Sequence, residues 1–192
     1  MPLSRDAFER AVAQLRTMAA LVVGQRAVAE RQLGDFLRRH PADAWALASR
    51  AHLLAQRGAD AEAVVDAEQL VANHPSRSAA DWFNLAFIRE RLSRLEEASV
   101  AFRRALELDP KLDRAWYGLA LVLVRLGRLE EATTALKRNT ELQPMSPYGW
   151  YQLARVHVER SEPEKARTII AHLKTFEPKV AAQLERETGL AA

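Results

Sequence analysis

The sequence repeats itself every 34 residues, and this period restricts the fold more than any other feature of the chain. Three tryptophans follow one another at a spacing of 34 residues: Trp82, Trp116 and Trp150. Four further columns keep the same spacing over three units: Leu85, Leu119 and Leu153; Ala86, Ala120 and Ala154; Ala98, Ala132 and Ala166; and Pro110, Pro144 and Pro178. A period of this length indicates a repeat architecture in which each unit packs against its neighbours along the chain.

Within each unit the pattern predicts two helices joined by a short turn. Ser93, Gly127 and Ser161 mark this turn at the same spacing, and each is followed three residues later by a glutamate. Ser-x-x-Glu is the capping-box pattern, so we expect Ser93 and Ser161 to cap the second helix of their units. Proline cannot continue a helix, so the proline column marks the end of each unit. The alanine columns predict places where two helix backbones approach closely.

The order W-x2-L-A, then a small residue, a large apolar residue four positions later and a proline, resembles the tetratricopeptide repeat. That family has the signature W-x2-L-G-x2-Y…A-x3-F…P over 34 residues. Here the glycine column is alanine, the phenylalanine column holds Phe102, Leu136 and Ile170, and the tyrosine column is degenerate. The resemblance implies an all-α fold, a right-handed superhelical solenoid of helical hairpins.

We expect residues 1–192 to form a single domain of about five hairpins and a C-terminal capping helix. The segments are a degenerate hairpin at 5–40, an irregular repeat at 44–75, clear repeats at 79–112, 113–146 and 147–180, and the capping helix at 181–190. The degenerate hairpin has no tryptophan, and Trp45 is displaced by about two positions from its column. This displacement predicts that the first helix of the irregular repeat, or its turn, is altered.

The composition and motifs give no support for catalysis. Without cysteine there is no disulfide, cysteine–zinc site or thiol nucleophile, and no phosphate-loop, dinucleotide, zinc-protease or serine-hydrolase motif occurs. His52 and His172 lack a carboxylate or a second histidine three or four residues later. His40 and His74 precede prolines, where an imidazole can cap a helix, and His157 is interpreted as a packing residue. We therefore expect a non-enzyme with no catalytic residue, metal or cofactor.

Charge and hydropathy also limit the partners. The net charge of +3 is spread over alternating acids and bases, which is typical of solvated helix faces and argues against a nucleic-acid partner. The apolar run from Met18 to Val23 is too short to cross a bilayer and does not read as a secretory signal. We expect no membrane insertion and a cytoplasmic location. The excess of arginine over lysine, beside abundant alanine, suggests a GC-rich bacterial genome.

The resemblance also implies a binding surface, because arrays of this family bind peptide segments or partner helices in a groove lined by the first helix of each unit. Carried over column by column, the groove residues are Phe83, Asn84, Phe87, Arg114, Tyr117, Leu121, Arg125, Tyr148, Tyr151 and Arg155. This aromatic and apolar surface suits an apolar or helical ligand. The carboxylate clamp of chaperone cofactors is disfavoured, because no unit has the required lysine and asparagine together.

These features predict a protein–protein scaffold or adaptor, and three alternatives stay open. Phe83, Tyr117 and Tyr151 could serve only to pack against neighbouring repeats. The chain could be a self-assembling structural protein whose N-terminal helices pair with a second copy. The candidate seam for that pairing is Phe8, Val12, Leu15, Met18 and Val22. The chain could also be the regulatory arm of a separately encoded enzyme, since the family's repeats often accompany catalytic domains.

Overall fold

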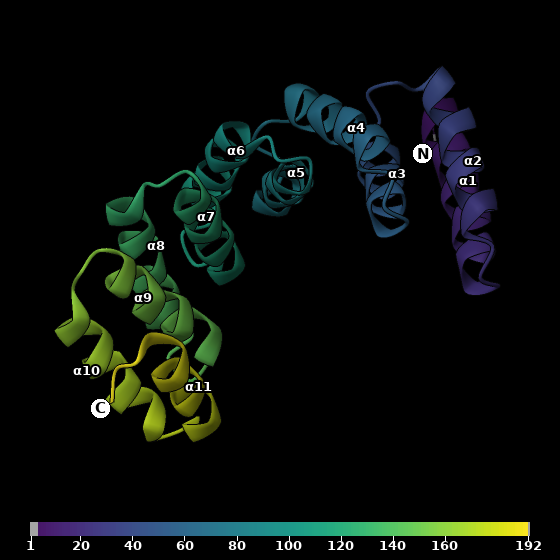
Figure 1. Ribbon diagram of the computed structural model, residues 1–192. Coiled ribbons are helices and arrows are strands. Elements are labelled where there is room, and N and C mark those ends of the chain that lie inside the picture. Colours follow the sequence, from purple (N-terminus) through teal and green to yellow (C-terminus); the bar gives the residue numbers. More distant parts are fainter. Residues whose placement is uncertain (1–3, 192) are drawn as a thin grey trace. The chain divides into compact units, whose positions relative to one another are not determined.

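The computed structural model describes residues 4–191, and all regular secondary structure within them is helical. The eleven helices of this described part are joined by short turns (Figure 1). They are α1 Arg5–Val22, α2 Arg26–Arg39, α3 Ala44–Gln56, α4 Asp60–Asn73, α5 Ala79–Arg91, α6 Leu95–Leu108, α7 Asp113–Arg125, α8 Leu129–Leu142, α9 Pro147–Glu159, α10 Pro163–Lys174 and α11 Pro178–Thr188. The predicted all-α solenoid of helical hairpins is confirmed.

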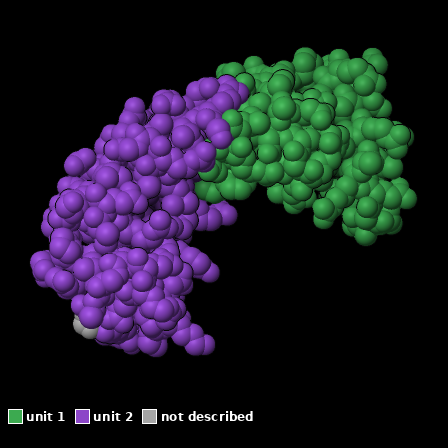
Figure 2. Space-filling view, in the orientation of Figure 1, with its two compact units in different colours: residues 1–92 green, residues 93–192 purple. Residues whose placement is uncertain are grey.

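The helices belong to two compact units, with α1 to α5 in residues 1–92 and α6 to α11 in residues 93–192 (Figure 2). In the first unit each helix packs against the next, and α5 also contacts α3. In the second unit consecutive helices pack in the same way, and α11 also contacts α9. The contact of α3 with α5 brings together the first helices of successive hairpins, and the contact of α9 with α11 brings a first helix against the final helix. One cavity lies beside each of these contacts.

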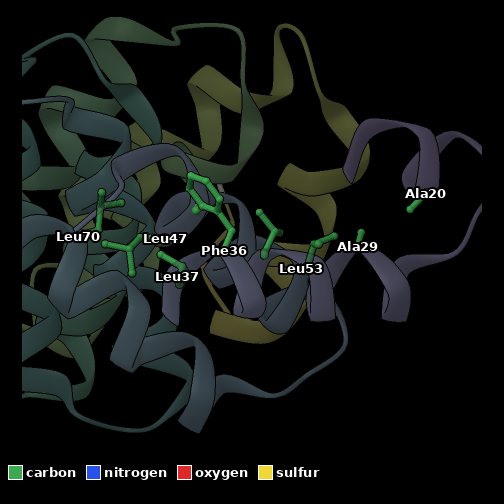
Figure 3. Close-up of a cluster of buried hydrophobic side chains, with 9 residues drawn as sticks. Ala20, Ala29, Phe36, Leu37, Leu47, Leu53 and Leu70 are labelled. Atoms are coloured by element: carbon green, nitrogen blue, oxygen red, sulfur yellow. The ribbon is translucent and has the colours of Figure 1, made fainter. Parts of the chain in front are cut away.

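Small and branched apolar side chains fill the space between helices. The first unit contains the cluster Ala20, Ala29, Leu33, Phe36, Leu37, Ala46, Leu47, Leu53 and Leu70, most of which Figure 3 labels. In the second unit the alanines of the repeat columns, such as Ala120 and Ala132, are fully buried, and Phe102 is 2% exposed. The close helix approaches predicted from the alanine columns are therefore present.

Three tryptophans tie a first helix to the turn before it. Each indole N–H donates to a proline carbonyl: Trp82 to Pro75 at 2.7 Å, Trp116 to Pro110 at 2.9 Å and Trp150 to Pro144 at 2.8 Å. This hydrogen bond gives a physical reason for the shared period of the tryptophan and proline columns. Trp45, the second residue of α3, instead lies edge-on to Phe36, with ring centroids 6.3 Å apart.

The turns inside the hairpins contradict the capping-box prediction. Ser93 and Ser161 both have φ of 59°, the left-handed conformation that Gly127 adopts at the same place in its unit. The helices that follow Ser93 and Ser161 begin after Arg94 and Glu162, and neither N-cap side chain makes a capping hydrogen bond. The prediction for the two serines is therefore wrong. They end the first helix in a role usually taken by glycine, instead of starting the second.

Candidate protein-binding groove

The ten predicted groove residues lie on the first helices of three hairpins and divide between the two units. Phe83, Asn84 and Phe87 belong to α5 in the first unit. The second unit holds Arg114, Tyr117, Leu121 and Arg125 on α7, and Tyr148, Tyr151 and Arg155 on α9. The helical positions carried over from the repeat columns thus fall on helices of the expected kind in both units.

In the first unit, α3 and α5 border an apolar groove with a volume of about 360 Å³. Helix α3 contributes Ala48, Ala51 and Ala55, whose spacing of three and four residues places them on one helix face. Helix α5 contributes Phe83, Asn84 and Phe87, and the remaining lining includes His52, Gln56, Ala67, Leu70, Asp81, Ile88 and Arg91. Small side chains on one wall and phenyl rings on the other leave room for an apolar side chain of a ligand.

The phenyl ring of Phe87 is the main exposed apolar group of this groove. Its side chain is 47% exposed, Phe83 is half-buried, and Asn84 is exposed. The Arg91 guanidinium lies 5.8 Å from the centroid of the Phe87 ring. It is held there by the carboxylate of Asp60 at 3.0 Å and the carbonyl of Ala55 at 3.1 Å. The chain itself therefore fixes the charged group at this wall, and a ligand would meet an apolar ring beside a neutral amide.

Two other polar residues of the groove have partners inside the first unit. Asp81 is buried, and Arg77 donates two hydrogen bonds to its carboxylate, at 2.6 and 2.7 Å. The Nε2 atoms of His52 and Gln56 are 2.8 Å apart. These contacts hold the ends of the side chains in place. Because the charge of Asp81 is paired with Arg77, the groove presents mainly apolar surface to a ligand.

In the second unit, α9 faces the final helix. The Tyr151 hydroxyl donates a hydrogen bond of 2.5 Å to the Glu187 carboxylate on α11. This bond raises the pKa of Tyr151 and lowers the pKa of Glu187. Tyr151 and Arg155 border a cavity of about 540 Å³ together with residues of α11 that include Thr188. The hydroxyl of Tyr151 is thus engaged by the chain's own last helix.

The other predicted residues of the second unit range from half-buried to exposed. Tyr117 and Leu121 are half-buried, whereas Arg114 is exposed and Tyr148 is 70% exposed. Arg125 donates to the Ser93 hydroxyl at 3.3 Å. The side chains of α7 and α9 therefore offer a mixed aromatic and arginine surface.

Sequence reasoning missed the α3 wall of the groove. Ala48, Ala51 and Ala55 were outside the carried-over columns because Trp45 is out of register, which hid the alignment of α3 with the clear repeats. The signal was present in the spacing of the three alanines. Glu187 was missed for another reason: α11 has no counterpart among the repeats from which a column could be carried over.

The histidines make contacts inside the chain. The His74 Nε2 atom lies 2.8 Å from the Ala42 carbonyl oxygen, and His40 lies 3.2 Å from the Glu9 carboxylate. His157 is buried, 2.6 Å from the Glu162 carboxylate, as expected for a packing residue. In residues 4–191 no group of three or more metal-ligating side chains could hold an ion. Likewise, no helix in this range combines the length and hydropathy that a membrane span needs.

Comparison with models of protein families shows to which family the chain belongs. Two family models, each described as a tetratricopeptide repeat, match residues 15–78 and 91–150. Together they cover nearly two thirds of the chain. The chain belongs to the tetratricopeptide repeat family. This membership supports a role as a protein–protein interaction module.

Solved structures share this tetratricopeptide repeat fold. MamA is 17% identical, with 95% of this chain and 96% of that chain aligned at a TM-score of 0.83. YrrB, described as a TPR protein with an unusual peptide-binding site, is 17% identical over 88% of each chain at 0.80. A repeat protein from Parabacteroides merdae is 18% identical, covering 93% of this chain and 73% of that one, also at 0.80. At these identities the likeness shows the fold alone. The comparison with curated proteins gives no match.

Proposed function

We propose that this tetratricopeptide repeat chain is a non-catalytic scaffold or adaptor that holds a peptide segment or helix of a partner protein in the groove between α3 and α5. The observation that carries the proposal is the groove itself, an apolar space of about 360 Å³ bordered by the exposed ring of Phe87. A concave apolar site with a few polar groups is the usual form of a binding site.

The chemistry of the two walls indicates what kind of segment would fit. The alanine face of α3 leaves space opposite the ring of Phe87, so one large apolar side chain of a partner can lie between them. The amide of Asn84 can both donate and accept a hydrogen bond, which suits the backbone of an extended or helical segment. The description of YrrB as having a peptide-binding site supports the use of this fold for peptides.

The predicted residues of the second unit belong to the same proposal as further contacts for the partner. The exposed ones are Arg114, Arg125, Tyr148 and Arg155, and the half-buried ones are Tyr117, Leu121 and Tyr151. Aromatic and arginine side chains are the types that contribute most to binding at protein interfaces. The hydroxyl of Tyr151 already bonds Glu187, so this residue would contact the partner through its ring.

The test uses peptides selected by phage display on the full chain, with affinities measured by fluorescence anisotropy. We expect Phe87→Ala to weaken binding at least tenfold, since a desolvated aromatic anchor is worth about 1–3 kcal/mol and about 1.4 kcal/mol is one decade. Circular dichroism should show unchanged helicity.

The matched control is Val100→Ala on α6, because Val100 is also an exposed apolar side chain, at 62%. It should leave the affinity unchanged. Equal affinity of the selected peptides for Phe87→Ala and the unmodified chain would reject the groove as the binding site.

A further inference from the structure

The first helix, α1, carries its large apolar side chains away from the core. Of its 18 residues, Thr17 and Ala20 are buried, and Ala13 packs partly against the cluster of the first unit. The large side chains are exposed instead: Phe8 at 60%, Leu15 at 71%, Met18 at 62% and Val22 at 85%. Helix α1 therefore packs against α2 through small residues, and its large ones contribute little to the hairpin.

The exposed residues follow a regular pattern. Phe8, Ala11, Leu15, Met18 and Val22 succeed one another at alternating spacings of three and four, the a and d positions of a heptad. Such a pattern lies on one helix face and is the seam through which two helices pack side by side. These five residues are called the α1 stripe below. A stripe of this kind on an exposed face indicates a partner helix.

We propose that the α1 stripe binds the α1 stripe of a second copy of the chain, antiparallel, with a two-fold axis at the level of Leu15. Leu15 is the central residue of the stripe, so this register buries the whole of it in both copies. The contact is isologous, because each copy contributes the same surface, and it closes as a dimer.

The stripe, together with Val12 and Ala19 beside it, is complementary to the same surface of the second copy in this register. Phe8 faces Val22 of the second copy, Leu15 faces its own counterpart, and the small residues Ala11 and Ala19 face each other. Phe8 and Val12 also border a cavity of about 360 Å³ between α1 and α2, which extends to Phe36. Val22 and Met18 of the second copy lie opposite these two residues, so they can enter this recess.

The charges beside the stripe also favour a like partner. The Glu9 carboxylate is paired inside the chain with Arg5 at 3.1 Å and Arg39 at 3.0 Å. In the antiparallel register Glu9 faces Leu21 of the second copy, and Arg16 faces Gln14. Arg10 is likewise paired inside the chain, with Asp43 at 3.3 Å, and no two like charges are opposed in this register.

The expected dimer is weak, because one helix from each copy lies at the small end of specific interfaces. We expect a dissociation constant on the order of 10 μM. Sedimentation or light scattering over a concentration series should therefore show a monomer that converts to a dimer and does not grow further.

Leu15→Glu places two carboxylates face to face across the axis and should weaken dimerisation at least tenfold. The control Val100→Glu introduces the same group at an exposed valine of α6 and should leave dimerisation unchanged. Both variants should keep their helicity, since both side chains are exposed. A chain that stays monomeric at every concentration overturns the proposal, as does a Leu15→Glu variant that dimerises normally. Growth beyond a dimer overturns it as well, because it indicates a head-to-tail contact.

The orientation is tested separately with cysteine, since the chain has none of its own. Leu15→Cys should be joined into a dimer by a short bismaleimide. Val22→Cys alone should not, because the two copies of residue 22 lie about 21 Å apart along the axis at about 1.5 Å per residue. A mixture of Phe8→Cys and Val22→Cys should give the mixed product. Self-linking of all three variants would indicate parallel helices and reject the register. Neither experiment involves the α3–α5 groove, so its outcome is independent of peptide binding.

Discussion

Helices α1 and α7 are both first helices of a hairpin, yet they use their side chains in opposite ways. Helix α7 has 13 residues and buries five of them: Ala115, Leu119, Ala120, Val122 and Leu123. Helix α1 has 18 residues and buries two. The difference matches the contacts that each helix makes, because α7 packs against both α6 and α8 within one unit, whereas α1 packs against α2.

The packing around α7 shows how strongly a neighbouring helix restricts a sequence. A Cβ atom added at Gly118 would lie 2.5 Å from the Phe102 ring of α6, so that position has no room for alanine. Helix α1 has no comparable restriction on its outer face. The repeat columns therefore encode contacts between neighbouring helices, whereas α1 packs against α2 and leaves the large side chains of its outer face exposed.

The sharpest test of this comparison is one substitution at two phenylalanines. Phe102→Ala removes a side chain that is 2% exposed and should destabilise the chain by about 3–5 kcal/mol. Phe8→Ala removes one that is 60% exposed and should cost less than about 0.5 kcal/mol in dilute protein. Urea unfolding followed by circular dichroism measures both. Similar losses at the two sites would mean that α1 is covered in solution even at low concentration.

A smaller effect is expected from enlarging an alanine in each helix. Ala120 is fully buried, so Ala120→Leu should destabilise by about 1–3 kcal/mol through overpacking. Ala11 is exposed on α1, so Ala11→Leu should leave the free energy of unfolding of the monomer nearly unchanged. Thermal melts compare the two variants. If the melting temperature of Ala120→Leu equals that of the unmodified chain, the assignment of residue 120 to a close helix contact is wrong.

The sequence predicts the structure best at positions that contact a neighbouring helix of the repeat array. It predicts the structure least well where one sequence pattern fits two different structural roles. The alanine columns correctly indicate buried helix contacts. Ser93 and Ser161 are misread because Ser-x-x-Glu fits both a capping box and a left-handed turn residue followed by an acidic first turn. Part of the candidate groove, Phe83 and Phe87, follows from the columns. Its opposite wall, including Ala51, does not, because the displaced Trp45 hides the alignment of α3 with the clear repeats.

Two carboxylates lie beside histidines, one in the first hairpin and one in the turn between α9 and α10. Glu162 lies 2.6 Å from His157, and Glu9 lies 3.2 Å from His40. The histidine and a neighbouring cation, Lys165 for Glu162 and Arg5 for Glu9, hold the pKa of each carboxyl below its ordinary value of 4.5. Each ionised carboxylate therefore stabilises the fold above pH 4.5, and this contribution is lost as the pH falls through the lowered pKa.

Glu162→Gln should accordingly lower the melting temperature at pH 7. The difference from the unmodified chain should narrow as the pH falls below 4.5 and through the lowered pKa of Glu162, because the carboxylate itself then becomes protonated. Glu9→Gln should show the same trend with a smaller gap, because the side chain of His40 is 23% exposed and that of His157 is 4% exposed. Melting curves of the three proteins from pH 7 to pH 3 measure both gaps. A difference in melting temperature that stays constant over this range would show that the carboxylates act through packing alone. A larger difference for Glu9→Gln than for Glu162→Gln would mean that the contact of Glu9 with His40 stabilises the fold more than the contact of Glu162 with His157.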